Sequence, residues 1–385
     1  MKLTQESMQL ERLVFLGKRF YTNKDALTER FGRIYQLPLE WSKRIGEVRC
    51  WLVDYHTRET VHVIDDALVI ASTPVLSWGA LKQLLYTCWG FRPNVVVASG
   101  DCYLGLLGWV IARICGAKLV FDIYDKYDDF GAYIRPLGFD TFGFLRHHTD
   151  LRLFASRALA DSYCGELPEE CDILVPNGVD DEQFRPLDAK AARSELDLPP
   201  RARIVGYFGG MEPDRGVSDL VAAVGRLQGE RVNIQLLICG KQHPATNLDH
   251  DWIIYRGMVP HVSMPLYINA CDVVAVPYRR SSFMDMGASC KIVEYLMCGV
   301  PVVSSRTPNF VDNYPRQAVE LMDCLFECGN VDDLERALCF QLDHGIVATT
   351  PHEIAWKRVA HDTLDAICKA IRMTPSVEHG LLGAP

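Results

Sequence analysis

The sequence predicts an α/β protein that is built from two doubly wound domains. Short runs of aliphatic and β-branched residues alternate with helix-length amphipathic segments along most of the chain. Such alternation is typical of parallel sheets with right-handed crossovers. A polar stretch with several prolines, 176–200, separates two blocks of this kind. The chain of 385 residues has room for two domains, because one domain usually holds ~100–200 residues.

The elements of the first block follow from its apolar runs and its helical periodicity. We predict strands at 13–16, 48–53, 67–71, 95–98 and 118–123. Helices are expected between them at 25–44, 77–89 and 104–115, and a further helical run is expected at 136–158. The first block therefore has the strand–helix order of a doubly wound sheet.

The second block repeats this order. We predict strands at 204–208, 234–239, 273–277 and 301–304, and helices at 217–227, 263–270, 288–298 and 352–371. The strand at 234–239 is apolar except for Gln235, so we expect a sheet that is covered on both faces. Ligands of such sheets bind outside the carboxyl ends of the strands. Functional residues are therefore expected in the loops that follow strands.

The composition limits the class of protein. Lysine and arginine number 40 and aspartate and glutamate 49, a net charge of −9 that excludes a globally basic nucleic-acid binder. The 14 cysteines are scattered without a CxxC pair, so we expect buried free thiols in a reducing compartment and no metal site. The first residues show no charged-then-apolar leader with a small-residue cleavage site. We therefore expect a cytoplasmic protein.

The first segment that carries chemistry is GYFGGMEPDRGVSDL, 206–220. It follows an apolar strand and precedes an amphipathic helix. Gly209 and Gly210 permit a close approach to the backbone, and Arg215 adds a guanidinium beside the N–H groups of the helix start. This combination predicts a phosphate site. The alternative is a tight turn with an exposed arginine.

The second segment is RRSSFMDMGASCKIVEYLMCGVPVV, 279–303. Its polar loop contains Asp285, Gly287 and Ser289. The helix after this loop carries Lys291 and Glu294, which are three residues apart and share one face. A cation there suits a diphosphate, and a carboxylate accepts hydrogen bonds from both hydroxyls of a diol. The alternative is an exposed ion pair worth roughly a few tenths of a kcal/mol.

A third segment, VPNGVD at 175–180, places an Asn177–Gly178 turn after an apolar strand. Together, in this order and spacing, the three segments resemble glycosyltransferase family 4, a group of nucleotide-sugar transferases with the GT-B fold. KIVEYLMCGVPVV resembles the donor helix and following strand of this family. GYFGGMEPDRGVSDL resembles the loop in which an arginine or lysine before a glycine holds the donor diphosphate.

The resemblance implies two Rossmann-like domains that face one another across a cleft. Residues 1–180 would form the acceptor domain, to which a C-terminal helix within 355–385 returns, and residues 181–354 would form the donor domain. The implied reaction moves a hexosyl unit from a UDP- or GDP-sugar to a hydroxyl of a glycan, a lipid-linked intermediate or a small molecule. The resemblance also implies retention of the anomeric configuration, with no metal or other cofactor required.

The resemblance assigns roles to residues of this sequence. The implied catalytic residues are Arg215, Lys291, Asp285, Tyr124 and Asp125. The implied donor-binding residues are Gly209, Gly210, Arg215, Gly287, Ser289, Lys291 and Glu294. Arg215, Lys291 and the backbone N–H groups of 209–210 and 286–289 would hold the diphosphate. Glu294 would hold the ribose hydroxyls, and Asp285 would contact the hydroxyls of the sugar.

The sequence departs from the family pattern at three places. Met286 stands where the family has the first of two glutamates, and Gly210 stands where many members have an arginine. Tyr124–Asp125 takes the place of a histidine–aspartate pair near the reacting carbon. Met286 and Gly210 favour an alternative, a non-catalytic relative that binds nucleotide sugar and acts as a regulatory or partner subunit. A sugar-nucleotide epimerase is a further alternative.

The first domain also contains basic clusters, the largest of which comprises Arg146, His147, His148, Arg152 and Arg157. In the string FGFLRHHTDLRLFASRAL these residues are mixed with phenylalanine and leucine, and a basic amphipathic helix can lie on an anionic membrane. The alternative is an ordinary helix with its basic face in water. A peripheral contact with the inner face of a membrane would suit a lipid-linked acceptor. We expect no nucleic-acid partner.

Overall fold

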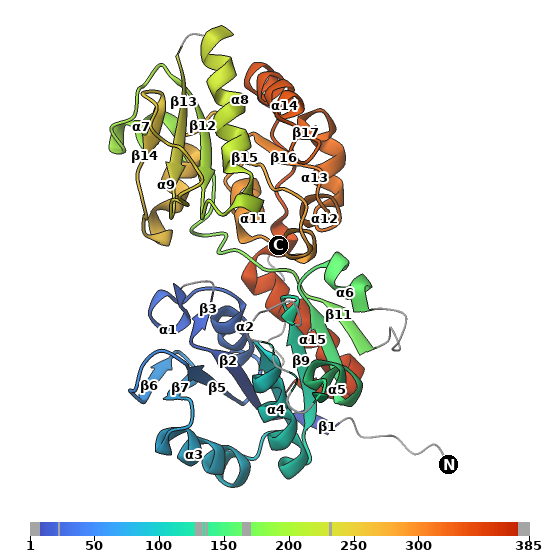
Figure 1. Ribbon diagram of the computed structural model, residues 1–385. Helices are drawn as coiled ribbons and strands as arrows, with labels where there is room; N and C mark the ends of the chain where they lie inside the picture. Colours follow the sequence, from blue (N-terminus) through green and yellow to red (C-terminus); the bar gives the residue numbers. More distant parts are fainter. Residues whose placement is uncertain are drawn as a thin grey trace, which may run out of the picture. The chain divides into compact units, whose positions relative to one another are not determined.

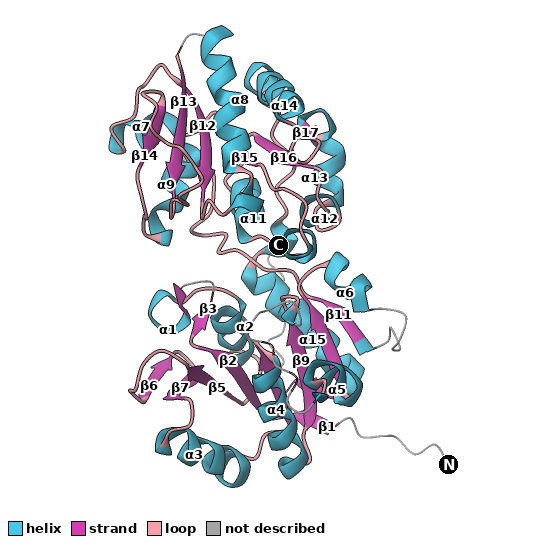
Figure 2. Ribbon diagram, in the orientation of Figure 1, coloured by secondary structure: helices cyan, strands magenta, loops and turns pink. Residues whose placement is uncertain are grey.

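The computed structural model describes residues 8–21, 24–127, 133, 135, 138–163, 171–230 and 233–375. The chain forms two compact units. Unit 1 comprises Met1–Gly178 together with Trp356–Pro385, and unit 2 comprises Val179–Ala355. Each unit has one central, largely parallel sheet that is flanked by helices (Figures 1 and 2).

The sheet of unit 1 has the strand order β11-β10-β9-β8-β2-β5-β7-β6. The strands are β2 (Arg12–Lys18), β5 (Glu47–Asp54), β6 (Val61–Asp65), β7 (Leu68–Pro74), β8 (Val95–Ser99), β9 (Lys118–Ile123), β10 (Leu151–Phe154) and β11 (Asp172–Leu174). All neighbours are parallel except β6 and β7. All five strands predicted for this block are confirmed. The edge strand β6 was missed.

The helices of unit 1 differ from the prediction at two places. They are α1 (Ala26–Glu29), α2 (Arg33–Ser42), α3 (Trp78–Leu85) with the π-helical continuation η1 (Tyr86–Phe91), α4 (Cys102–Cys115), α5 (Thr141–His148), α6 (Arg157–Tyr163) and α15 (Trp356–Ile371). The single helix predicted at 25–44 is wrong, because Arg30 and Gly32 have φ of 50° and 73° and separate α1 from α2. The helical run predicted at 136–158 is also wrong. Residues 136–137 lie outside the described ranges, and β10 follows α5.

Helix α15 is packed into unit 1 by one apolar face. The buried residues of this face include Val359, Leu364 and Ile367, which recur at helical spacing. The indole Nε1 of Trp41 on α2 donates a hydrogen bond of 2.7 Å to the carbonyl of Ala360. Strand β18 (Met373–Pro375) then pairs in parallel with β1 (Met8–Leu10). The C-terminal segment therefore belongs to the same compact unit as the N-terminal strands.

A fully buried ion pair stabilises the centre of unit 1. Arg33 donates to both carboxylate oxygens of Asp122, at 3.0 and 2.6 Å. A third donor, Ser99, lies 2.5 Å from the same carboxylate. Arg33 also donates to the side chain of Asn177 at 3.1 Å. The asparagine of the turn before unit 2 thus satisfies part of a buried guanidinium, which is the condition for a buried charge to be tolerated.

The sheet of unit 2 is parallel and has the order β14-β13-β12-β15-β16-β17. Its strands are β12 (Arg203–Phe208), β13 (Ile234–Cys239), β14 (Ile253–Tyr255), β15 (Val273–Val276), β16 (Val302–Ser305) and β17 (Leu325–Phe326). Numbered within the unit, this is the 3-2-1-4-5-6 order of a Rossmann sheet, whose ligand crevice lies where the order reverses. That switch point lies between β12 and β15.

The helices of unit 2 cover both faces of this sheet (Figure 2). They are α7 (Ala189–Glu195), α8 (Val217–Glu230), α9 (Met264–Asn269), α10 (Ser282–Met286), α11 (Cys290–Met297), α12 (Pro308–Val311), α13 (Pro315–Glu320) and α14 (Val331–His344). Strands and helices predicted at 204–208, 217–227, 234–239, 263–270, 273–277, 288–298 and 301–304 are confirmed. Gly299 follows α11 with φ of 64°, as a helix-ending glycine does.

Three further observations concern the described ranges alone. The cysteines in these ranges are free, and most of them are buried; Cys164 lies outside them. No helix in these ranges combines the length and the apolar character that crossing a membrane requires. Within the same ranges, no group of three or more His, Cys, Asp or Glu side chains is arranged to hold a metal ion.

Candidate functional site

The loops that follow β12 and β15 are held together at the switch point of unit 2. Gly216 has φ of 66°, and a Cβ on it would lie 1.7 Å from the carbonyl oxygen of Pro277. The N–H of Arg279 donates to the carbonyl of Asp214 at 2.9 Å. Since only glycine permits this approach, the sequence brings the 209–216 loop against the end of β15.

Lys291 on α11 lies among tyrosine side chains of these two strand ends. Its Nζ donates to the hydroxyl of Tyr207 at 3.1 Å. The same Nζ lies 4.8 Å from the ring centroid of Tyr207 and 5.6 Å from that of Tyr278. Burial lowers the pKa of Lys291, but the two tyrosines more than compensate, so the net direction of the pKa is upward. The ammonium is therefore held in its charged form.

Gly209 makes room for this ammonium. Its φ is 142°, and a Cβ there would lie 2.1 Å from Nζ of Lys291 and 2.2 Å from Cε. The next loop is equally tight, because a Cβ on Gly240 would lie 2.0 Å from the carbonyl oxygen of Gly209. The cation of α11 consequently lies directly against the backbone that follows β12.

Arg215 brings a second cation to the same tyrosine. It ends the short 3₁₀ helix η5 (Pro213–Arg215). Its guanidinium carbon lies 5.4 Å from the ring centroid of Tyr278 and 5.7 Å from that of Phe283. Burial lowers the pKa of Arg215, but Tyr278, Tyr207, Asp214 and Glu212 together raise this pKa by more, so its net direction is upward. Two charged cations thus lie within 6 Å of one ring, which suits a group with two negative charges.

The backbone donors of the two loops are partly engaged. The N–H of Gly209 donates to the carbonyl of Cys239 at 2.7 Å, and the N–H of Ser289 donates to the side chain of Asn309 at 3.1 Å. Gly210 differs, since no acceptor for its N–H occurs among the residues that the structure describes. Of the N–H groups expected to face a diphosphate, Gly209 and Ser289 therefore already have protein partners, and Gly210 has none there.

Glu294 lies on α11 one turn after Lys291. It is only 8% exposed. The Nε2–H of His261 donates to its Oε1 at 2.8 Å. His261 begins the short helix η6 (His261–Ser263), and its ring lies 5.1 Å from that of Phe184. One carboxylate oxygen is thereby fixed by the protein, and the orientation of the carboxylate is set by a residue far away in sequence.

Asp285 and Gly287 lie at the end of α10. Both oxygens of Asp285 accept hydrogen bonds from Nε of Arg280, at 2.8 and 2.7 Å. Gly287 ends α10, and a Cβ on it would lie 3.0 Å from Nδ2 of Asn309. The side chain of Asn309 thus lies against Gly287 and also accepts from Ser289. The loop before α11 is therefore fixed by asparagine rather than left open.

The comparisons with known proteins agree with this geometry. Residues 202–344 match the family model described as glycosyl transferases group 1. We refer to this matching part of unit 2 below as the glycosyltransferase domain. It contains Gly209, Arg215, Lys291 and Glu294, and it excludes the whole of unit 1.

Several relatives of this chain are named D-inositol 3-phosphate glycosyltransferase. A D-inositol 3-phosphate glycosyltransferase of Segniliparus rotundus is 32% identical over 152 residues, which are 36% of this chain and 32% of the relative. A protein of the same name from Mycobacterium bovis is 28% identical over 154 residues, 37% of this chain and 30% of the relative. The matched part of the chain therefore spans only about a third of the length of these relatives.

Solved structures extend the likeness of fold beyond the glycosyltransferase domain. Sucrose-phosphate synthase from Thermosynechococcus elongatus has a TM-score of 0.70 at 15% identity, over 94% of this chain and 99% of its own. HepE of Anabaena, in complex with UDP-glucose, has a TM-score of 0.65 at 15% identity, over 93% of this chain and 99% of its own. The expected GT-B class, with two Rossmann-like units, is confirmed by this likeness.

Two candidate residues lie outside the glycosyltransferase domain. Tyr124 and Asp125 follow β9 at its carboxyl end, in unit 1. The N–H of Tyr124 donates to the hydroxyl of Tyr127 at 3.2 Å, and that hydroxyl donates to the carbonyl of Asp122. Tyr124 is buried and Asp125 is half-buried. The residues thus stand where ligands of parallel sheets bind, beside the buried pair of Arg33 and Asp122.

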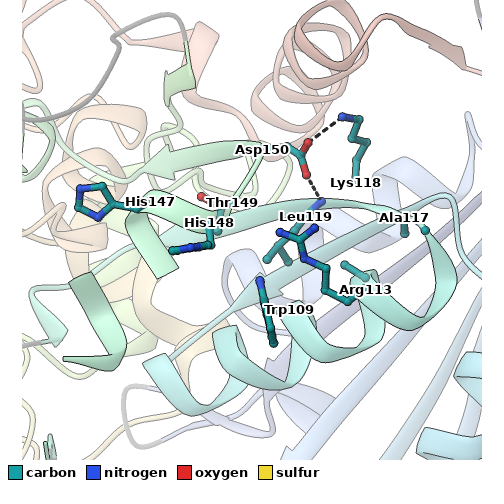
Figure 3. A pocket seen from close by; sticks show the side chains of 11 residues that line it. Trp109, Arg113, Ala117, Lys118, Leu119, His147, His148, Thr149 and Asp150 are labelled. Carbon is teal, nitrogen blue, oxygen red and sulfur yellow. Dashed lines mark hydrogen bonds and ion pairs between the residues drawn. The ribbon is translucent and has the colours of Figure 1, made fainter. Parts of the chain in front are cut away.

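A pocket of about 450 Å³ lies at the amino ends of strands β9 and β10 in unit 1 (Figure 3). Its lining includes Trp109 and Arg113 on α4, Lys118 at the start of β9, and Asp150 just before β10. Asp150 accepts from Lys118 at 2.7 Å and from the N–H of Leu119 at 2.9 Å. Ligands of parallel sheets bind at the carboxyl ends of the strands, so this pocket at the amino ends is not the expected ligand site.

The basic string FGFLRHHTDLRLFASRAL does not form one amphipathic helix. It is divided into α5, β10 and the start of α6. Arg152 is buried in β10 and pairs with Asp172 at 2.5 Å. His147 and His148 are exposed at the end of α5. The hypothesis that this string forms a membrane-binding helix is therefore wrong.

Sequence reasoning missed several residues of the site in the glycosyltransferase domain. These are Tyr207, Tyr278, His261 and Asn309. Tyr207 and Tyr278 could have been predicted, because each lies near the carboxyl end of an apolar strand and carries a hydroxyl group. Ligands of a Rossmann sheet bind at these strand ends. His261 and Asn309 had no comparable signal, since each acts through a tertiary contact with α11 or the loop before it.

Proposed function

We propose that this protein is a glycosyltransferase that moves a hexosyl unit from a nucleotide-diphosphate sugar to a hydroxyl acceptor. The observation that carries the proposal is the placement of Arg215 and Lys291 against Tyr278, with Glu294 one turn further along the same helix. Two cations and a carboxylate at one switch point match the charges of a diphosphate and the hydroxyls of a ribose.

The cations act on the leaving group. When the bond between the sugar and the diphosphate breaks, negative charge develops on the departing oxygen. Arg215 and Lys291 are already charged and fixed against aromatic rings, so they stabilise this charge without reorganising. The N–H of Gly210 adds a neutral donor to the same loop. Removal of one such donor typically lowers kcat by about 10²–10³.

Glu294 binds the ribose of the nucleotide. Its carboxylate accepts hydrogen bonds from the two ribose hydroxyls, and His261 holds Oε1 in the orientation that this requires. The donor is a UDP-sugar or a GDP-sugar, and the UDP-glucose complex of HepE supports the former by analogy of fold. Asp285, held by Arg280, contacts the hydroxyls of the transferred sugar.

The proposal for acceptor binding is based on the family resemblance and on two residues of unit 1. Tyr124 and Asp125 are proposed to contribute to acceptor binding and to the reacting centre. The acceptor is a glycan, a lipid-linked intermediate or a small molecule that offers a hydroxyl. We also propose that transfer retains the anomeric configuration and needs no metal or other cofactor, and that unit 1 acts as the acceptor domain and unit 2 as the donor domain.

A second candidate function is that of a non-catalytic subunit that binds nucleotide sugar. Met286, the last residue of α10, is the observation that favours it, because no carboxylate stands there to contact the sugar. The described cluster around Lys291 and Arg215 favours the enzyme, since a regulatory site has no need of groups fixed against a developing charge. Turnover separates the two candidates.

The experiment measures the release of UDP and GDP from a panel of UDP- and GDP-hexoses, with and without hydroxyl acceptors. We expect release from one donor, and a loss of about 10²–10³ in kcat for Lys291→Ala and Arg215→Ala. Arg316→Ala is the matched control, because Arg316 is an exposed arginine on α13 of the same unit. Release by neither the wild type nor the control, despite retained nucleotide binding, would favour the non-catalytic subunit.

A further inference from the structure

Helix α3 presents an apolar stripe to water instead of to the core. No residue of α3 is buried. Along α3 and η1, the exposed residues Trp78, Leu81, Leu85 and Trp89 are spaced by three or four positions, and Tyr86 lies beside them. Trp78 is 80% exposed and Trp89 is 63% exposed. Residues at this spacing form one face of a helix, so the stripe is continuous over about three turns.

The turn before α3 extends the stripe. Leu76 is 98% exposed, and Val75 beside it is exposed as well. Leu76 has φ of 54°, a left-handed conformation that is uncommon for residues other than glycine. The turn is held by hydrogen bonds from the N–H of Val75 to Asp54 and from the hydroxyl of Ser77 to Pro74. Leu76 therefore combines a strained backbone conformation with an apolar side chain that is exposed to solvent.

Within the segment that carries the stripe, the charged residues are all basic. The segment 75–92 contains Lys82 and Arg92 and no aspartate or glutamate, in a chain whose net charge is −9. Both residues are exposed. Arg49 adds a guanidinium 5.2 Å from the ring of Tyr86, although Glu47 lies 3.7 Å from it. The turn that touches Gly79 through Thr60 carries one residue of each sign, Arg58 and Glu59.

We propose that α3, η1 and the turn before them form a surface that binds an anionic lipid bilayer. Tryptophan and tyrosine are favoured at the level of the headgroups, leucine lies below them, and lysine reaches back to the phosphates. The surface has each of these parts in one helix. In Figure 1, α3 lies at the margin of unit 1, and it packs on β7 and continues into η1.

A bilayer fits this surface better than a second copy of the chain. In a two-fold dimer, the same patch on each subunit would meet itself, so Lys82 and Arg92 would share an interface with the same two cations of the second copy. Like charges in such an interface oppose association, whereas anionic headgroups are attracted to both residues. The inference does not depend on the proposed transfer reaction, because lipid binding is measured without nucleotide or acceptor.

The test is sedimentation of the full chain with vesicles of phosphatidylcholine alone and of phosphatidylcholine with phosphatidylglycerol. We expect binding to the anionic vesicles that weakens with added salt. The double variant Trp78→Ser/Trp89→Ser should bind at least roughly tenfold more weakly, because it removes two large exposed apolar side chains from the surface that meets the lipid. Lys82→Glu should weaken binding to the anionic vesicles and leave binding to the phosphatidylcholine vesicles unchanged.

The matched control is Val319→Ser/Met322→Ser, which removes two exposed apolar residues from unit 2. It should bind vesicles like the wild type, and the thermal midpoints of all variants should stay close to that of the wild type. Equal vesicle binding by the tryptophan variant would overturn the proposal, as would a wild type that stays in the supernatant. A tryptophan variant that alters the mass of a soluble oligomer, with vesicle binding unchanged, would assign the surface to a protein partner instead.

Discussion

Gly209 and Lys291 are in contact because Gly209 has no side chain. A Cβ at this position would lie 2.1 Å from the ammonium nitrogen. The two residues come from different elements, the loop after β12 and the helix α11, and their contact places a charged group against the backbone at the switch point of the sheet. The position of the cation therefore depends on a glycine 82 residues earlier in the chain, by the difference of the two residue numbers.

This relationship predicts the effect of Gly209→Ala. The new methyl group displaces Lys291, and the φ of 142° is strained for alanine, so we expect a loss of about 1–3 kcal/mol in stability. We also expect at least roughly tenfold weaker binding of a nucleoside diphosphate, because a charge-assisted hydrogen bond is worth about 1.5–3 kcal/mol. Chemical denaturation and calorimetric titration measure the two effects. Gly329→Ala is the control, since Gly329 has φ of 75° and no atom within 4 Å of the added Cβ; it should lose stability but keep its nucleotide affinity.

The bond between His261 and Glu294 predicts a preference for ribose. If Glu294 binds the ribose hydroxyls, the wild type should bind UDP or GDP more tightly than the matching 2′,3′-dideoxynucleotide by roughly tenfold or more. Glu294→Ala should bind both forms equally. His261→Ala should lie between the two, because Oε1 is no longer oriented by Nε2. Competitive titrations with the two forms give the ratio for each variant. A ratio that Glu294→Ala leaves unchanged would remove Glu294 from the ribose site.

The raised pKa of Lys291 predicts how nucleotide binding depends on pH. Burial lowers this pKa, while Tyr207 and Tyr278 raise it by more. A raised pKa means that the charged form persists to higher pH, so its contribution is present below the ordinary lysine pKa and is lost only as the pH rises through the folded-state value. We expect the affinity for a nucleoside diphosphate to be constant from about pH 7.5 to 9.5. A fall in affinity within this range that Lys291→Arg abolishes would contradict the upward direction.

The buried pair in unit 1 predicts a large loss of stability. Asp122→Asn leaves the guanidinium of Arg33 without a counter-charge in a site that excludes water, and breaking such a pair costs about 3–5 kcal/mol. The exposed pair of Arg358 and Asp362 on α15 provides the comparison. Asp362→Asn should change stability by less than about 1 kcal/mol. Equal losses for the two variants in urea unfolding would show that the buried pair does not stabilise unit 1.

The regular part of the fold could be predicted because its signals are local. The strands at 118–123 and 234–239 are mainly apolar runs, and both have these bounds in β9 and β13. The predicted helix at 25–44 failed because its hydrophobic period continues across Gly32, whose φ of 73° ends the helical geometry. The run at 136–158 failed because β10 is a four-residue strand, which is too short to show a period of its own.

The sequence predicted the site residues whose role follows from their own side chain. It did not predict those whose role depends on a contact with a residue that is distant in sequence. Lys291 and Glu294 stand out as a cation and a carboxylate on one helical face. The sequence does not show that Gly209 N–H is already bonded to Cys239. Nor does it show that His261 reaches Glu294 across 33 residues. Such partners are set by the order of strands in the sheet, which local patterns do not specify.

The most direct test of the proposed donor site is nucleotide binding followed by thermal unfolding. The wild type, Arg215→Ala and Glu294→Ala are each unfolded with UDP, GDP, ADP and dTDP. A nucleotide at 100 times its dissociation constant stabilises the folded state by about 2.7 kcal/mol. We predict that one of the four raises the midpoint of the wild type and that both variants lose this rise. If none of the four raises the midpoint of the wild type, unit 2 does not hold a nucleotide donor and the account of this site is wrong.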